Sequence, residues 1–269
     1  MITPIQALIL GLVEGLTEFL PVSSTGHLIL AAHWLGLEGD AVKTFEVVIQ
    51  AGAILSVLAL YRARALSMWQ GLLGRDAAGR RLLRNLMISF LPAAVIGLAL
   101  RDVIKERLFG PWPVVLALAI GGVFMVLVSR WFAANRQMTV KPIESMTVLD
   151  AAVIGLAQCL SLWPGTSRAM VTIVAGMFLG LPAPAAAEYS FLLALPTLGA
   201  ATALDLVKGG SELFGQVGVL SIALGLISAA VVAALAIRGL VRYLSRRGLA
   251  PFGWYRLALA GVVMLISVK

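Results

Sequence analysis

The sequence predicts an all-α polytopic membrane protein, with six transmembrane helices plus two re-entrant helical hairpins in an inverted-topology repeat. Of its 269 residues, 60% are hydrophobic and only 13% are charged, whereas about 25% of the residues in soluble domains are charged. A water-soluble globule of this size cannot bury so much apolar surface, and so apolar a chain does not stay disordered. Apolar segments of spanning length recur along the chain, and two further apolar segments are interrupted by short polar turns.

Six segments are long and apolar enough to cross a bilayer as helices. They are residues 45–62, 86–101, 112–132, 187–206, 216–237 and 253–268.

Two other apolar segments stop at a proline and resume after a polar turn. Residues 5–37 are interrupted at Pro21, in Pro-Val-Ser-Ser-Thr-Gly, and residues 148–180 at Pro164, in Pro-Gly-Thr-Ser-Arg. Each half is too short to cross a core of ~30 Å at ~1.5 Å per residue. We therefore expect two re-entrant hairpins, whose turns are stable at membrane depth only inside protein or around a wet cavity.

The two interrupted segments also resemble each other in sequence. The run from Gly11 to Thr17 aligns with the run from Gly155 to Ser161. After a gap of one residue, Pro21 matches Pro164, Ser24 matches Ser167 and, further on, Glu46 matches Glu188.

This similarity predicts a duplicated unit within a single integral membrane domain, residues 1–269. The first repeat is residues 1–140, with hairpin 5–37 and three spans, and the second is residues 141–269, with hairpin 148–180 and three spans. Because three spans change side, the second repeat starts on the opposite face, and the two turns can meet inside the membrane.

The basic residues are concentrated in the connections after the first, third and fifth spans. The positive-inside rule places these connections in the cytoplasm and both termini outside, so that the first hairpin enters from the outer face. The net charge of +8 is thereby explained, and no nucleic-acid partner is expected.

Two glutamates lie within the first apolar segment, where ionisable groups are costly and indicate function. Glu14 and Glu18 are four residues apart and project from one helix face. This spacing suits a divalent-metal site or a carboxyl pair with different pKa values; the alternative is a hydrated surface helix.

The first turn combines three hydroxyls with an imidazole: Ser23, Ser24, Thr25 and His27. Hydroxyls and free N–H groups at a helix start form an anion site, although hydroxyls there also serve as ordinary N-caps. His27 alone would be a packing residue, but beside two carboxylates it is a candidate catalyst.

The second turn contains Arg168, which is the only basic residue between Lys141 and Lys208. A guanidinium binds phosphate in a bidentate manner; the alternative is that Arg168 extends to the membrane surface. The polar groups around it are expected to bind phosphate as well: Gly165, Thr166, Ser167 and Thr172. Glu46, Gln158 and Glu188 are expected to support the site without reacting.

These motifs carry a family resemblance. The run from Glu14 to His27, Glu-Gly-Leu-Thr-Glu-Phe-Leu-Pro-Val-Ser-Ser-Thr-Gly-His, together with Pro-Gly-Thr-Ser-Arg168, resembles the bacitracin-resistance type of undecaprenyl-diphosphate phosphatase. The runs Lys43–Gln50 and Glu188–Pro196 are also similar to that family. One departure is Ala169, where the family commonly has serine after the arginine.

The resemblance implies an enzyme of the bacterial inner (plasma) membrane that hydrolyses undecaprenyl diphosphate to undecaprenyl phosphate. This reaction recycles the lipid carrier for peptidoglycan synthesis and gives bacitracin resistance. The catalytic residues it implies are Glu14, Glu18, Ser24, His27 and Arg168, with either Ser24 or His27 attacking phosphorus.

The phosphates are expected to contact Ser23, Thr25, Arg168 and the polar groups of the second turn, in a site open to the outer, periplasmic face. A divalent cation, Mg²⁺ or Ca²⁺, is expected at Glu14 and Glu18. The expected partners are the polyprenyl diphosphate substrate and membrane lipids, with a homodimer as an open alternative to a monomer. The rival function is a transporter or flippase of a lipid phosphate or another anion, because inverted repeats with broken helices are also a transporter architecture.

Overall fold

The computed structural model describes residues 2–108, 110–135 and 141–267, apart from the side chains of residues 102, 105, 111, 212 and 267. Within this part of the chain every regular element is helical, which confirms the all-α class. The α-helices are α1 (Pro4–Thr17), α2 (Ser24–Trp34), α3 (Asp40–Leu60), α4 (Arg62–Leu72), α5 (Ala77–Ala99), α6 (Arg101–Leu108), α7 (Pro111–Ala134), α8 (Val148–Gln158), α9 (Arg168–Phe178), α10 (Ala183–Gln216), α11 (Val219–Leu244) and α12 (Ala250–Ser267). Two short 3₁₀ helices, η1 (Ile143–Ser145) and η2 (Cys159–Leu162), flank α8.

Five of the described helices are long and apolar enough to cross a membrane: α3, α5, α7, α10 and α11. They cover most of five of the six segments expected to span, so the chain is a multi-pass membrane protein. The sixth expected segment, residues 253–268, forms most of α12, which is apolar but shorter than those five. Its last residue, 268, lies outside the described residues.

The connection after α3 contains a helix that the hydropathy pattern did not predict. It forms α4, and the backbones of α4 and α5 approach so closely that a Cβ on Gly79 would collide with the Ser67 carbonyl. Asp76 caps α5 by accepting from the N–H groups of Ala78 and Gly79, and it also accepts the Ser67 hydroxyl at 2.6 Å. The Ser67 and backbone bonds hold the pKa of Asp76 below its ordinary value.

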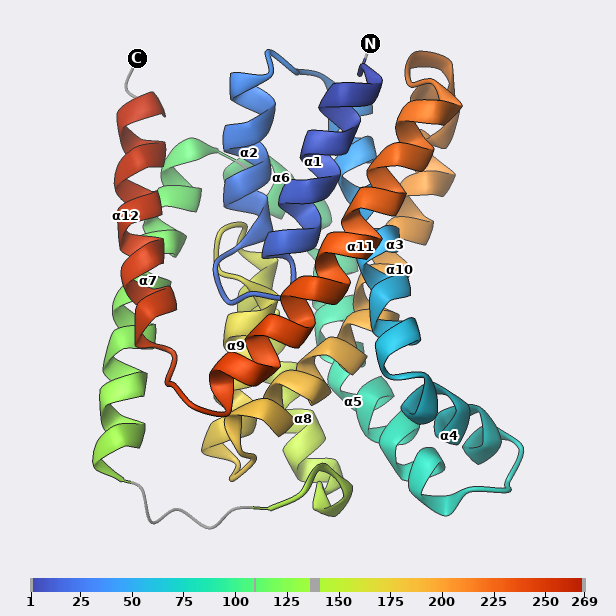
Figure 1. Ribbon diagram of the computed structural model, residues 1–269, viewed down its shortest axis with the longest axis vertical. Coiled ribbons are helices and arrows are strands. Elements are labelled where there is room, and N and C mark those ends of the chain that lie inside the picture. Colours follow the sequence, from blue (N-terminus) through green and yellow to red (C-terminus); the bar gives the residue numbers. More distant parts are fainter. Residues whose placement is uncertain (1, 109, 136–140, 268–269) are drawn as a thin grey trace.

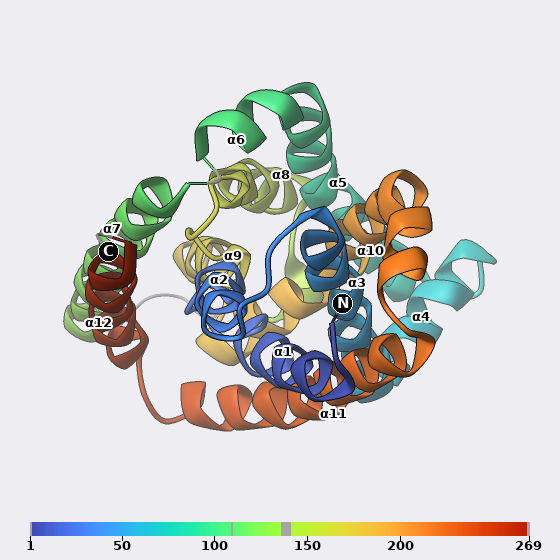
Figure 2. The same ribbon diagram turned by 90° about the horizontal axis from the view of Figure 1, so that it is seen from above.

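Two helical hairpins enter the molecule from opposite ends. Both termini lie at one end in Figure 1; α1 and α2 form a hairpin from that end, and α8 and α9 form one from the other. The two turns meet near the middle of the molecule, and Figure 2 shows α2 and α9 surrounded by the longer helices. Val22 and Ser23 of the first turn and Pro164 and Gly165 of the second are buried in the protein.

The two hairpins share an unusual backbone conformation at corresponding positions. Ser23 and Ser167 precede α2 and α9, which have 11 residues each. Their φ/ψ values are 73°/97° and 72°/111°, and in the described part of the chain they are the only residues other than glycine with positive φ. When the two hairpins are aligned by backbone conformation, Ser23 corresponds to Ser167 and Ser24 to Arg168. The sequence alignment with a one-residue gap, which matched Ser24 with Ser167, is therefore wrong.

Close helix packing holds the first hairpin in place. Gly11 and Gly15 of α1 lie against α11, where an added Cβ would meet the Gly225 and Ala229 carbonyl oxygens at 2.3 and 2.4 Å. Small residues of this kind let helix backbones approach in membranes. The turn that follows α1 is therefore anchored on a long helix.

Candidate active site

A buried ion pair joins the two turns. Arg168 Nη2 donates to Glu18 Oε1 at 3.1 Å, and the Ser24 hydroxyl donates to Glu18 Oε2 at 2.6 Å. The Glu18 and Arg168 side chains are each only 7% exposed. Arg168 thus points into the protein and does not extend to the membrane surface. A carboxylate, a hydroxyl and a guanidinium, all expected from the sequence, are brought together.

Arg168 is held in place by α10. Its Nη1 donates to the Ser190 carbonyl at 2.8 Å, and its guanidinium lies 5.9 Å from the centre of the Phe19 ring. The Thr172 hydroxyl donates to the Arg168 carbonyl at 2.8 Å and accepts from the Ser190 hydroxyl, whose oxygen lies 2.7 Å away. Thr172 is therefore buried beside the arginine, one helical turn away from the start of α9.

Glu14 is fully buried, and neither of its carboxylate oxygens has a hydrogen-bond partner among the described residues. Its carboxyl group interacts electrostatically with Glu18, Glu46 and Arg168. A buried carboxyl group without a partner is unfavourable unless it is protonated or bound to a cation. No cluster of three or more potential metal-ligating side chains occurs in the described residues, so a cation at Glu14 and Glu18 would draw further ligands from a bound molecule or water, as Mg²⁺ often does.

His27 lies on the first turn of α2, with both ring nitrogens engaged. Nδ1 is 2.8 Å from the Ser23 carbonyl oxygen, and Nε2 is 2.7 Å from the hydroxyl of Tyr255 on α12. A carbonyl oxygen only accepts, so Nδ1 carries the proton and Nε2 of the neutral ring accepts from Tyr255.

The remaining residues of the two turns lie at the starts of α2 and α9, and only one of these helices has a serine side chain as its cap. The Ser167 hydroxyl accepts from Met170 N at 3.2 Å and so caps α9, whereas Ser23 makes no such side-chain bond at the start of α2. Thr25 and Thr166 are half-buried beside these helix starts. Gly165 has φ of 96°, and an added Cβ there would lie 2.8 Å from the Val114 carbonyl oxygen.

The three residues expected to support the site lie at different distances from it. Gln158 is buried and donates to the Ser89 carbonyl at 3.3 Å. Glu188 pairs with Arg64 of α4 at 2.8 Å, which links α4 to α10. Glu46, on α3, is the member of this group that interacts electrostatically with Glu14.

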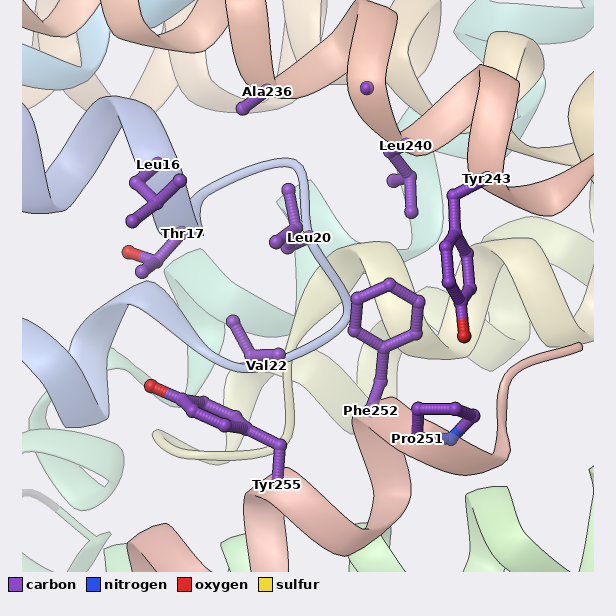
Figure 3. A pocket seen from close by; sticks show the side chains of 11 residues that line it. Leu16, Thr17, Leu20, Val22, Ala236, Leu240, Tyr243, Pro251, Phe252 and Tyr255 are labelled. Atoms are coloured by element: carbon purple, nitrogen blue, oxygen red, sulfur yellow. The ribbon is translucent and has the colours of Figure 1, made fainter. Parts of the chain in front are cut away.

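An apolar cavity of about 550 Å³ lies beside the first turn (Figure 3). It opens between the end of α1, the turn itself, and the facing parts of α11 and α12. Its lining is almost entirely carbon: Leu16, Thr17, Leu20, Val22, Ala236, Gly239, Leu240, Tyr243, Pro251, Phe252 and Tyr255. Tyr255, which lines this cavity, also binds His27, so the cavity lies next to the polar site.

Sequence reasoning missed three residues of this region: Ser190, Tyr255 and Arg256. Arg256 is fully buried, and its Nη2 donates to the carbonyl oxygens of Gly165 at 2.8 Å and Ala117 at 3.0 Å. It lies inside a predicted span, and an ionisable residue in a span is a functional candidate by the same rule that identified Glu14. Ser190 binds Arg168 mainly through its backbone carbonyl, and no sequence motif reveals a contact of that kind.

Comparison with known proteins now identifies the family. The family model for the bacitracin resistance protein BacA matches residues 7–262. The chain belongs to this family. It is 50% identical over 260 residues to an undecaprenyl-diphosphatase of Sorangium cellulosum, covering 96% of this chain and 85% of that protein. It is 47% identical to undecaprenyl-diphosphatase 2 of Rhodospirillum rubrum, covering 97% and 93%, and 43% identical to an undecaprenyl-diphosphatase of Methylibium petroleiphilum, covering 97% and 94%.

Proposed function

We propose that this protein hydrolyses undecaprenyl diphosphate to undecaprenyl phosphate and phosphate. This activity recycles the lipid carrier for peptidoglycan synthesis and gives resistance to bacitracin. The observation that carries the proposal is the Glu18 carboxylate, which binds the Ser24 hydroxyl on one turn and the Arg168 guanidinium on the other. The names of the family's members agree with it.

The diphosphate binds where the two helix starts meet. The first N–H groups of α2 and α9 and the Arg168 guanidinium attract anionic oxygens. The hydroxyls of Ser23, Thr25, Thr166 and Ser167 and the Gly165 backbone line the same two turns and complete the phosphate site. Thr172 contributes by holding Ser190, which orients Arg168.

Ser24 is the nucleophile that this geometry favours. Its oxygen forms a bond to the terminal phosphorus while its proton passes to Glu18, 2.6 Å away. The bond from that phosphorus to the bridging oxygen breaks, and undecaprenyl phosphate leaves. Water then attacks the phosphoserine, and His27 Nε2 accepts the proton of that water. The bond from phosphorus to the Ser24 oxygen breaks, Glu18 returns its proton to that oxygen, and phosphate leaves. Arg168 stabilises the charge that develops on the phosphoryl oxygens.

His27 is the other candidate nucleophile, because its Nε2 carries the lone pair. The two mechanisms differ in the trapped intermediate: phosphoserine survives acid, whereas phosphohistidine is hydrolysed by it. Rapid acid quenching with ³²P-labelled substrate, followed by mass spectrometry, therefore separates them. Acid-stable label at Ser24 is the expected result, and acid-labile label at His27 would contradict the assignment.

Glu14 and Glu18 fit a divalent cation, Mg²⁺ or Ca²⁺, because Glu14 has two buried oxygens without partners. Such a cation, when bound, neutralises charge on phosphate oxygens. A chelator is expected to lower activity, and Mg²⁺ or Ca²⁺ to restore it. In a Glu14→Gln variant the cation concentration for half-maximal activity should rise, because one charged ligand is lost.

The apolar cavity beside the first turn suits the isoprene units next to the diphosphate. Its lining is apolar, and it reaches His27 through Tyr255. The rest of the prenyl chain would stay among the membrane lipids. Enlarging a wall residue such as Ala236 to Leu should raise KM for long prenyl diphosphates more than for short, soluble ones.

The proposed topology is six spans and two re-entrant hairpins, in repeats of residues 1–140 and 141–269. The site then opens to the outer, periplasmic face of the bacterial inner membrane. The matching conformations of Ser23 and Ser167 support the repeat. Cysteine labelling from each side of the membrane tests the topology, and cross-linking in membranes tests whether the chain forms a homodimer.

Phosphate release from undecaprenyl diphosphate by the purified protein tests the function. The wild type and Glu38→Gln, an exposed control, should release phosphate, whereas Glu18→Gln should lose about 10²- to 10³-fold in kcat. A folded wild type that releases no phosphate with any divalent cation would contradict the proposal. Flux of a lipid phosphate or inorganic anion through liposomes holding that protein would then favour a transporter.

A further inference from the structure

Two adjacent residues of α12 each contact one turn of the site, although α12 belongs to neither hairpin. The Tyr255 hydroxyl lies 2.7 Å from His27 Nε2 on the first hairpin. Arg256 Nη2 lies 2.8 Å from the Gly165 carbonyl oxygen on the second. Successive residues of a helix project about 100° apart, so one helix can reach both turns at the same level.

Tyr255 determines how the His27 ring is presented. The Ser23 carbonyl fixes the proton on Nδ1, and the tyrosine hydroxyl donates to the lone pair on Nε2. The two rings are parallel, 5° apart in plane angle, with centroids separated by 5.6 Å. His27 is thereby held in one tautomer and one orientation, with Nε2 directed toward Tyr255.

Arg256 is a buried cation without a carboxylate partner among the described residues. Besides Gly165, its Nη2 donates to the Ala117 carbonyl oxygen at 3.0 Å, and within the part of the chain that the structure describes Nε and Nη1 have no hydrogen-bond partner. Burying an unpaired charge is costly. The chain nevertheless makes room for it, because a Cβ on Gly121 of α7 would lie 2.3 Å from Nη2.

We propose that Tyr255 and Arg256 are positioning residues of the phosphatase site, one for each turn. Tyr255 keeps Nε2 of His27 unprotonated and aligned, and it yields this bond when the diphosphate arrives from the apolar cavity that it lines. Arg256 fixes the Gly165 carbonyl, and so the start of the helix that carries Arg168, while its charge attracts the anionic substrate. This inference rests on the proposed function, but its first test does not.

The first test measures the reactivity of His27 Nε2 without substrate. Diethylpyrocarbonate acylates unprotonated imidazole nitrogens, and mass spectrometry separates His27 from His33, which is exposed and serves as an internal reference. Tyr255→Phe should accelerate the modification of His27 by about 3- to 10-fold, the value of one hydrogen bond. The rate at His33 should not change.

Tyr243→Phe is the matched control, because Tyr243 lines the same cavity but packs against Phe252 and not against His27. An unchanged His27 rate in Tyr255→Phe would overturn the role of Tyr255, even if the protein were a phosphatase. A faster His27 rate in a protein without phosphatase activity would instead contradict only the proposed function.

Tyr255→Phe should also lower kcat/KM about 3- to 10-fold. In a His27→Gln background, with its residual activity, the same change should have no further effect, because Tyr255 acts through His27. If Tyr255→Phe lowers kcat/KM by the same factor in the His27→Gln background as in the wild type, Tyr255 does not act through His27.

The second test removes and then replaces the guanidinium. Arg256→Ala should lower kcat/KM at least about tenfold, and added guanidinium, but not NaCl at equal ionic strength, should recover part of that loss. A folded Arg256→Ala protein with normal kcat/KM, or with a loss that guanidinium does not change, would overturn the role of Arg256. If that variant does not fold, Gly121→Ala gives the same test, because its Cβ displaces Nη2 from Gly165 while the charge stays. Gly261→Ala, with open space around its Cβ, is the control and should keep normal activity.

Discussion

The two turns at the centre of the molecule have the same backbone but different chemistry. Each has a serine with positive φ followed by an 11-residue helix. The first residue of that helix is Ser24 in one hairpin and Arg168 in the other. The proposed nucleophile and the phosphate-binding guanidinium therefore occupy equivalent positions, and Glu18 binds both. In the proposed mechanism, two helix starts with the same backbone differ in chemistry because their first side chains differ.

The turns also differ in the side-chain hydrogen bonds that hold them in place. Ser167 caps α9 through Met170 N, and Gly165 is held by Arg256. At the first turn Ser23 makes no cap bond, and its carbonyl instead orients His27. The second turn is thus held by a side-chain cap and by Arg256, whereas Ser23 provides no such cap at the first turn.

The largest predicted effect comes from removing the guanidinium of the second turn. Arg168→Gln leaves the buried Glu18 carboxylate without its cation and removes the charge that stabilises the phosphoryl group. We expect kcat/KM for phosphate release to fall about 10³-fold. Arg246→Gln, at an exposed position after α11, is the control and should stay near wild type. A loss of similar size in both variants would mean that the assay responds to positive charge in general.

The next largest effect distinguishes the hydroxyls of Ser24 and Ser167, which the sequence alignment had matched. Ser24→Ala should lower kcat about 10²-fold or more, because it removes the proposed nucleophile. Ser167→Ala should change kcat by less than about threefold, since its hydroxyl lines the phosphate site but forms no bond to phosphorus. The same hydroxyl caps α9, which is worth about 1 kcal/mol of stability. The measurement is steady-state phosphate release at saturating substrate. Equal losses at the two serines would refute the division of roles between the turns.

The smallest effect concerns stability alone. Ser167→Ala removes a cap and should lower the free energy of unfolding by about 1 kcal/mol, whereas Ser167→Gly should cost only a few tenths because glycine accepts positive φ. Ser23→Ala removes no cap bond and should be nearly neutral. Thermal unfolding in detergent, followed by circular dichroism, compares the three variants. If the Tm of Ser23→Ala is as low as that of Ser167→Ala, the two serine side chains stabilise their turns equally, and this prediction is wrong.

Much of this architecture could be predicted because helices that span a membrane need long apolar segments, which are easily recognised in a sequence. Uninterrupted apolar runs located the long helices, and Pro21 and Pro164 marked the two turns. The helix α4 was missed because its residues are too polar for a hydropathy reading, and it is stabilised by packing on α5. The one-residue gap was wrong because proline and serine were matched by identity, whereas the backbone conformation repeats at Ser23 and Ser167.

The site was predicted where residues act through side chains within a compact motif. Glu18, Ser24 and Arg168 are in contact because the two turns meet, which the topology had suggested. Ser190 could not be found this way, because its backbone carbonyl binds the arginine. Tyr255 lies 228 residues from His27, and no local pattern encodes so distant a contact.

The central claim is that the two turns form one catalytic unit through Glu18 and Arg168. A double-mutant cycle tests it most directly, with kcat/KM for phosphate release measured in the wild type, Glu18→Gln, Arg168→Gln and the double variant. Residues that act as a unit give non-additive losses. We predict that kcat/KM of the double variant equals that of the less active single variant within about threefold. Losses that multiply would show that the two residues act independently and would contradict the account.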